Sequence, residues 1–276
     1  MTGTLFVVAT PLGNLGDLST RAAETLCQVA VVAAEDTRRT KRLLNHLDAH
    51  PRLMSLPAFA EDDRADAVLS VLEKDLDVAL VSDAGTPGVS DPGTALVARA
   101  RARDIPVVPI PGPSAVATAL SASGLPADRY LFLGFPPRKG TSRRELLATI
   151  AKSPWTVVLY ESPNRLGALL KDLGAAVGGE RAAVVGRELT KLHEEIVAGT
   201  LDELAARFGE ASVKGEVTVV VAGQRQAQPE PDSAAVAEAA AALIAEGLPT
   251  KDIVRQLTEN WGLSRNDGYR LVMRLS

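Results

Sequence analysis

The sequence predicts an α/β protein with two α/β domains followed by a small helical segment. Short apolar runs rich in valine and alanine alternate with segments in which apolar residues recur every three or four positions. The chain has 276 residues, of which 46% are hydrophobic, so it is long enough to bury two separate cores. Loops that contain glycine or proline follow several of the apolar runs. Together these observations indicate helices layered on sheets.

The first half of the chain is expected to form a parallel sheet. Runs without polar alternation are typical of strands that are covered on both faces. The expected strands are residues 5–9, 31–34, 78–81 and 107–110, and the expected helices are 19–29, 37–47, 64–74 and 94–103. Ligands of such open α/β sheets bind beyond the carboxyl ends of the strands.

The second half is expected to contain a mixed sheet. The expected strands are residues 130–135, 156–160, 182–187, 193–200 and 216–221, and the expected helices are 142–152, 164–173 and 201–208. The run 182–187 is separated from 193–200 by too few residues for a crossover helix, so these two strands are antiparallel. We therefore expect an N-terminal domain over 1–121 and a second α/β domain over 122–224.

The C-terminal segment, residues 233–276, follows a linker rich in Gln and Pro at 223–232. Three short helices are expected at 233–246, 250–260 and 265–274, in an arrangement like a helix-turn-helix. Basic and acidic residues balance in this segment, so charge does not favour phosphate binding. Two roles remain open for it: contact with RNA, and packing or the bracing of a dimer.

Composition excludes several classes of protein. The formal net charge of −4 excludes bulk electrostatic coating of nucleic acid, so any such contact must be local. The single cysteine, Cys27, excludes a disulfide framework. His46, His50 and His193 form no ligand-spaced cluster with Cys27, so we expect no metal site. Neither a basic leader nor a long apolar run is present, which predicts a soluble, cytoplasmic protein without a membrane partner.

Four loops follow the expected parallel strands and would meet at one edge of the sheet. They are TPLGNLGD (10–17), EDTRRTK (35–41), VSDAGTPGVSDPG (81–93) and PGPSA (111–115). Glycines in the third loop lack a Cβ, so their main-chain atoms can approach a ligand closely. No Gly-x-Gly-x-x-Gly fingerprint or P-loop is present. A turn or helix cap explains any one loop, but four at one edge predict a ligand pocket.

Seven segments in the correct order resemble the motifs of the bacterial ribosomal small-subunit methyltransferase I family, in the tetrapyrrole methylase superfamily. They are VVATPLGNLGDLSTRA, AAEDTRRTKRLL, VSDAGTPGVSDPG, VVPIPGPSA, FLGFPPRKG, YESPNRL and GRELTKLHEE, and they span about residues 5–221. The resemblance implies S-adenosylmethionine held in a cleft between two α/β domains and a homodimer. It also implies methylation of the ribose 2′-hydroxyl of a cytidine in the decoding region of 16S rRNA, within the small ribosomal subunit.

The resemblance also implies which residues face the methyl donor. Main-chain amides and carbonyls at residues 85–87 suit its amino-acid end and its ribose, while Asp83 suits a hydroxyl or supports the loop. The implied cofactor-binding residues are Pro11, Asp83, Gly85, Thr86, Pro87, Ser114, Ala115, Phe135, Leu189, Gly215, Glu216 and Val217.

The acceptor side is predicted from local positive charge. Four of the five residues from Arg38 to Arg42 are basic and begin a helix, where amides and guanidinium groups both suit phosphate. A solvated helix face is the alternative. The expected substrate-binding residues are Arg38, Arg39, Arg42, Arg138, Lys139, Glu161 and Arg187. Arg187, with Glu188 and Lys191, either braces the cleft or touches substrate.

The chemistry calls for a base that takes the proton of the attacking hydroxyl. Asp36 or Glu35 is the expected base, Lys41 or Arg38 is expected to orient the ribose-phosphate, and Glu161 is another candidate. For each carboxylate the alternative is an ion pair with a neighbouring arginine. Two rival functions are methylation of carbon atoms of a tetrapyrrole and RNA binding by a non-catalytic adaptor.

Overall fold

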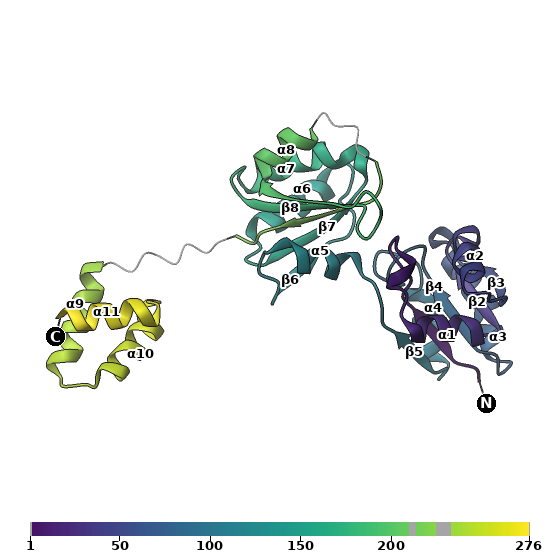
Figure 1. Cartoon of the computed structure of the whole chain (residues 1–276), viewed down its shortest axis with the longest axis horizontal. Coiled ribbons are helices and arrows are strands. Elements are labelled where there is room, and N and C mark those ends of the chain that lie inside the picture. The colour runs from purple at the N-terminus through teal and green to yellow at the C-terminus, as the bar shows by residue number, and fades with distance from the viewer. Residues whose placement is uncertain (1, 210–213, 225–232, 276) are drawn as a thin grey trace. The chain divides into compact units, whose positions relative to one another are not determined.

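The computed structural model describes residues 2–209, 214–224 and 233–275. The chain divides into two compact units, Met1–Gln224 and Arg225–Ser276 (Figure 1). The first unit contains two five-stranded sheets and the second contains three helices. Most of the expected linker, residues 225–232, lies outside the described residues.

The first sheet has the strand order β3-β2-β4-β1-β5, and all neighbouring strands are parallel. Its strands are β1 (Leu5–Val8), β2 (Val31–Ala34), β3 (Arg52–Ser55), β4 (Val78–Val81) and β5 (Val107–Ile110). The expected parallel sheet is confirmed, but the expected number of four strands is wrong. The additional strand β3 lies at an edge and pairs with β2 alone, and both of its end residues are exposed. Because β3 is not buried on both faces, its sequence lacks the continuous apolar run that marks the others.

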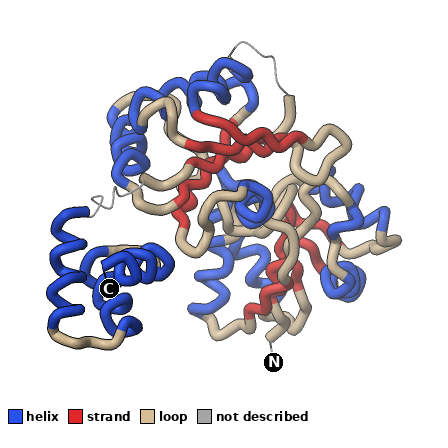
Figure 2. Tube along the Cα trace, turned by 60° about the vertical axis from the view of Figure 1, so that its left-hand side comes forward, coloured by secondary structure: helices blue, strands red, loops and turns tan. Residues whose placement is uncertain are grey.

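Two helices cover each face of the first sheet, as Figure 2 shows by helices on both sides of the strands. They are α1 (Thr20–Gln28), α2 (Thr37–His46), α3 (Glu61–Leu72) and α4 (Thr94–Ala102), with short 3₁₀ helices η1 (Leu15–Asp17) and η2 (Ala58–Ala60). Alternate residues of β2 pack to opposite sides, because successive side chains of a strand point to opposite faces. Val31 and Ala33 pack with α3 and α4, whereas Val32 and Ala34 pack with α1 and α2.

The second sheet has the order β6-β7-β10-β8-β9. Its strands are β6 (Tyr130–Phe132), β7 (Thr156–Glu161), β8 (Ala182–Arg187), β9 (Glu195–Thr200) and β10 (Val217–Val221). The pair β6–β7 is parallel and the remaining pairs are antiparallel, which confirms the expected mixed sheet. Strand β6 ends earlier than expected, and Gly134, at a φ of +61°, turns the chain beyond it.

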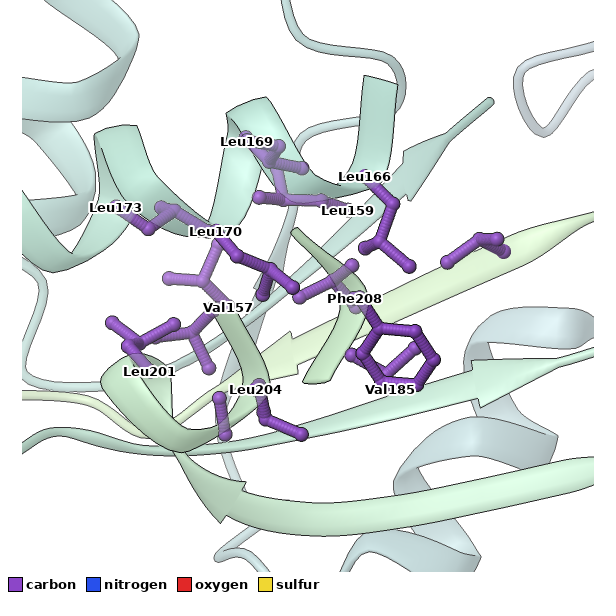
Figure 3. Packing of buried hydrophobic residues seen from close by; sticks show 14 of the residues in the cluster. Val157, Leu159, Leu166, Leu169, Leu170, Leu173, Val185, Leu201, Leu204 and Phe208 are labelled. Atoms are coloured by element: carbon purple, nitrogen blue, oxygen red, sulfur yellow. The ribbon is translucent and has the colours of Figure 1, made fainter. Parts of the chain in front are cut away.

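Helices cover both faces of the second sheet. They are α5 (Ala115–Ser123), α6 (Thr141–Lys152), α7 (Leu166–Val177) and α8 (Leu201–Phe208), and the 3₁₀ helix η3 (Pro163–Arg165) precedes α7. Figure 3 shows side chains of α7 and α8 meeting Val157 and Leu159 of β7. Val158 instead packs with α5 on the opposite face. Helix α5 follows the last strand of the first sheet but packs on the second sheet. The expected domain boundary at residue 121 remains a prediction.

The C-terminal unit consists of α9 (Ser233–Ala245), α10 (Thr250–Trp261) and α11 (Arg265–Leu275). Val236, Leu257 and Val272, one from each helix, belong to its buried core. Gly268 of α11 faces α10, and an added Cβ there would lie 3.3 Å from Val254, so the glycine permits a close crossing. None of the helices in the described ranges has the length and apolar character that a membrane crossing requires.

The packing of α7 generates a test of the second core. Leu170 is fully buried against this sheet, so Leu170→Ala is expected to lower the free energy of unfolding by about 2–5 kcal/mol. Urea unfolding followed by tryptophan fluorescence measures the change. Phe59→Ala serves as the control, because Phe59 is 92% exposed and its loss is expected to cost less than about 0.5 kcal/mol. Equal effects of the two substitutions would contradict this packing.

Candidate active site

A cavity of about 480 Å³ lies at the carboxyl ends of β1, β2, β4 and β5. The loops that follow these strands form one side of it, and residues of the second sheet and its loops form the other. We call it the first cavity. The sequence-predicted residues that line it are Glu35, Arg39, Asp83, Gly85, Thr86, Ser114, Ala115, Phe135, Glu161, Gly215, Glu216 and Val217.

Hydrogen bonds join the loops beneath the first cavity. Thr10 and Gly85 exchange two main-chain bonds of 2.8 and 3.0 Å. The Thr10 hydroxyl donates to the carbonyl of Ser82 at 3.1 Å, and the Thr86 hydroxyl donates to the carbonyl of Pro113 at 3.1 Å. Gly85 has a φ of +86°, which side-chain-bearing residues rarely adopt. The loops after β1, β4 and β5 therefore form one connected floor.

Asp83 connects this floor to the start of α2. Its Oδ1 accepts from the main-chain N–H of Asp36 at 3.1 Å, and its Oδ2 lies 3.3 Å from Nη1 of Arg39. Asp36 itself caps α2 and pairs with Arg38 at 2.8 Å. Hydrogen bonds from the Arg38 side chain and main chain hold the pKa of Asp36 to about 2. The alternative role of an ion pair with a neighbouring arginine thus describes Asp36, and its low pKa makes it a weak base. Asp36 lines neither this cavity nor the second cavity described below.

Most of the charged side chains that line the first cavity are carboxylates. Five carboxylates line it, and Arg39 is its one basic side chain among the described residues. Burial, followed by the charge of Asp83, raises the pKa of Glu35, and burial also raises the pKa of Asp83. Clustered acids with raised pKa values are typical of functional sites and favour a cationic ligand.

Asp91 and Tyr160 line the first cavity but are absent from the sequence-predicted site. Burial and the nearby charge of Glu35 raise the pKa of Asp91 to about 6. Burial, followed by the charge of Asp91, raises the pKa of Tyr160 to about 12. The Asp-Pro pair resembles an ordinary helix start in sequence, but its position in the same loop as Asp83 and Gly85 is a signal that points to the site.

Glu161 is the most buried charged group of the first cavity. Its side chain is fully inaccessible, its Oε1 accepts from the main-chain N–H of Ser162 at 2.8 Å, and Arg165 pairs with it. The other oxygen, Oε2, has no hydrogen-bond partner within the described part of the chain. A buried acceptor without a partner is costly unless a ligand or water satisfies it.

A second cavity of about 420 Å³ adjoins the first, and Pro11 and Arg42 line it. The predicted residues that line neither cavity are Asp36, Arg38, Lys41, Pro87, Arg138, Lys139, Arg187 and Leu189. Leu189 is buried against α5 and Pro87 is also buried, whereas Arg138 and Lys139 are exposed. Arg187 pairs with Glu195 at 3.0 Å and so braces β8 against β9.

Lys191 joins two carboxylates beside the second cavity. Its Nζ donates to Glu188 at 2.7 Å and to Glu216 at 2.8 Å. The main-chain N–H of Asn14 donates to the Thr190 hydroxyl at 3.2 Å, which ties the loop after β1 to this segment. Over the described ranges, no three His, Cys, Asp or Glu side chains are placed to share a metal ion.

Comparison with known proteins defines the class of this protein. Residues 4–205 match the family model of the Tetrapyrrole (Corrin/Porphyrin) Methylases. The chain therefore belongs to the tetrapyrrole methylase family, and it is a methyltransferase.

Two of its relatives carry a more particular name. It is 45% identical over 98% of its length to the "Ribosomal RNA small subunit methyltransferase I" of Micromonospora olivasterospora, covering 86% of that protein. It is 43% identical over 99% of its length to the protein of the same name from Synechocystis sp., covering 98% of that protein.

Solved structures share the fold. A cobalt precorrin-4 methyltransferase aligns with a TM-score of 0.63 at 16% identity, over 79% of this chain and 94% of the other. A uroporphyrin-III C-methyltransferase from Thermus thermophilus, complexed with S-adenosylhomocysteine, aligns with a TM-score of 0.60 at 19% identity, over 80% and 97% of the two chains. These likenesses agree with the two α/β sheets described above.

The raised pKa of Asp91 generates a pH-dependent prediction. Asp91 titrates at about 6 in the folded protein and at 3.8 as a free aspartate. The protonated form of Asp91 is therefore favoured in the folded protein. The stability it contributes is fully present below about pH 4 and is lost as the pH rises through about 6. Asp91→Asn avoids that loss, so its Tm is expected to exceed the wild-type Tm at pH 8 but not at pH 4. With solvent screening allowed for, the effect is on the order of 1 kcal/mol, or roughly 2–4 °C.

Calorimetry of the ligand-free protein from pH 4 to 8 measures this difference. Asp104→Asn, which replaces an exposed aspartate at a turn, is measured alongside as the control. A Tm difference between Asp91→Asn and wild type that stays constant with pH would contradict the assigned titration.

Proposed function

We propose that this methyltransferase moves a methyl group from S-adenosylmethionine to the ribose 2′-hydroxyl of a cytidine in the decoding region of 16S rRNA. The observation that carries the proposal is the convergence of four strand-end loops on one acid-lined cavity. Support for the substrate comes from relatives of 42–46% identity that are named ribosomal RNA small subunit methyltransferases.

The first cavity suits S-adenosylmethionine in volume and in chemistry. Its volume falls within the range of roughly 300–1,000 Å³ that is usual for small-molecule sites. Gly85 and Thr86 line it, and Ser114 and Ala115, which also line it, lie at the start of α5. We assign to these residues the amino-acid end and ribose of the donor. When bound, the donor supplies an electrophilic methyl group on a positively charged sulfur.

The carboxylates of the first cavity are complementary to the positive charges of the donor. A sulfonium and an ammonium group are both cations, and carboxylates such as Glu35 and Asp91 stabilise them in a partly desolvated site. The partnerless Oε2 of Glu161 offers a buried acceptor to a donor N–H or hydroxyl. Phe135 and Tyr160, whose rings lie 5.5 Å apart, add apolar surface for an adenine ring.

The partner of the protein is assigned from the same proposal. We propose that it acts on rRNA within the small ribosomal subunit and therefore works in the cytoplasm, which cell fractionation tests.

We also propose a homodimer. Leu192 is 94% exposed, and Ile196 on the edge strand β9 is also exposed, which provides apolar surface for such a contact. A light-scattering mass of a single chain would contradict the dimer.

Helix α11 of the C-terminal unit carries three exposed arginines. Arg265, Arg270 and Arg274 are exposed on α11 beside the half-exposed Tyr269, and Asp267 is its one acidic residue. Arginines with an adjacent aromatic ring suit phosphates and an unstacked base. Of the two roles left open by the sequence, we therefore propose RNA contact through α11.

The proposed reaction is tested with donor labelled in its methyl group and small-subunit particles from a strain that lacks this protein. We expect label on one ribose, whereas a porphyrin precursor accepts none. Binding to RNA without transfer would favour a non-catalytic adaptor, and labelling of the porphyrin alone would favour the tetrapyrrole reaction. Either result would contradict the proposal.

Gly85→Ala links this transfer to the first cavity. An alanine at φ +86° is strained, and its Cβ would lie 3.3 Å from Leu12, so we expect donor affinity to fall at least about tenfold by calorimetry. Gly124→Ala is the matched control, because Gly124 also has a positive φ but an added Cβ would meet open space. Equal donor affinities in the two variants would place the donor elsewhere.

The role of α11 is tested by replacing Arg265, Arg270 and Arg274 together with alanine. We expect the Kd for the small subunit to rise about tenfold and its salt dependence to weaken, with donor affinity unchanged. The control replaces Lys251 and Arg255 on α10. The helix has a packing role instead if the triple variant binds the subunit normally but has a lower Tm, or if light scattering gives the mass of a single chain.

A further inference from the structure

The second cavity differs from the first in charge. Three cations, Arg39, Arg42 and Lys191, line it, against two carboxylates. Leucines also line it, among them Leu15, which is 45% exposed. Arg42 makes no ion pair within the described residues, so its guanidinium is available to an anion. A nucleotide, which has a flat aromatic base and a phosphate on its sugar, suits this combination of leucines and cations.

The two cavities share one wall. Leu12, Arg39, Asp83, Ala84 and Glu216 line both of them. A ligand in one cavity is therefore separated from a ligand in the other by no more than these side chains. Transfer between two bound molecules requires their reacting atoms to come within about 3–3.5 Å, and ligands of the two cavities can approach each other most closely at these shared residues.

We propose that the second cavity holds the acceptor nucleotide and that Asp83, in the common wall, accepts the proton of its ribose hydroxyl. This inference rests on the proposed function. As the ribose oxygen forms its bond to the methyl carbon, the bond from sulfur to that carbon breaks and its electron pair stays on sulfur. The hydroxyl proton passes to the Asp83 carboxylate, so charge and atoms balance.

Asp83 fits this role better than its neighbours. Burial raises its pKa more than the contacts with the Asp36 N–H and Arg39 lower it, which makes its carboxylate a stronger base than an exposed aspartate. Glu216, the other carboxylate of the common wall, is held by Lys191 at 2.8 Å and its side chain is 63% exposed. Asp36 pairs with Arg38 and lies outside both cavities.

Arg42→Ala tests the nucleotide site. We expect the KM for the small subunit to rise about tenfold, and its Kd by filter binding to rise with it, because a phosphate contact is lost. The donor Kd by calorimetry and kcat at saturating subunit are expected to stay within twofold. The control is Arg101→Ala, since Arg101 is exposed at the end of α4 and lines neither cavity. An unchanged KM and Kd in Arg42→Ala would overturn the assignment of this cavity.

Asp83→Asn tests the proton acceptor. The amide oxygen can still accept from the Asp36 main chain, so the loop is expected to stay in place. We expect the single-turnover rate at saturating donor and subunit to fall about 10²–10⁴-fold, while the Kd for the subunit stays within about threefold. A rate within twofold of wild type would overturn the role of Asp83. If the wild-type protein transfers no methyl group to RNA, the proposed function fails, and this inference with it.

Discussion

The site depends on the parallel pairing of β2, β4, β1 and β5. Parallel neighbours bring their carboxyl ends to one edge, so four loops that are far apart in sequence meet there. The two main-chain bonds between Thr10 and Gly85 join the loops of β1 and β4, and Asp83 joins the loop of β4 to the start of α2. Without this register the polar groups of the first cavity would not share one space.

The two adjoining cavities differ in the charge of their lining residues, as their two proposed ligands differ in charge. The charged residues of the first cavity are mainly carboxylates, whereas cations outnumber carboxylates in the second, although the two cavities share Asp83 and Glu216. A cationic donor and an anionic nucleic acid are each favoured by the cavity of opposite charge. The local cations also explain how a chain with a net charge of −4 contacts RNA in our proposal. Specific placement of a few charges, rather than overall charge, decides the partner.

Much of the fold is predictable from the sequence, because buried parallel strands have a direct signature. Runs such as Val31–Ala34 and Val78–Val81 are apolar throughout and correspond to β2 and β4. Strand β3 has no such signature, since edge strands are covered less and tolerate Arg52 and Ser55. The site is less predictable. Local sequence places Asp83, Gly85 and Asp91 in one loop at a strand end, but only tertiary contacts bring Tyr160 of the second sheet to the same cavity.

Ultraviolet photolabelling with methyl-labelled S-adenosylmethionine, followed by peptide mapping, tests the central claim most directly. If the loops after the parallel strands hold the donor, label will appear in the peptides that contain residues 81–93 and 111–123, and excess S-adenosylhomocysteine will suppress it. Specific label confined to the C-terminal unit, with none in these loops, would contradict the account.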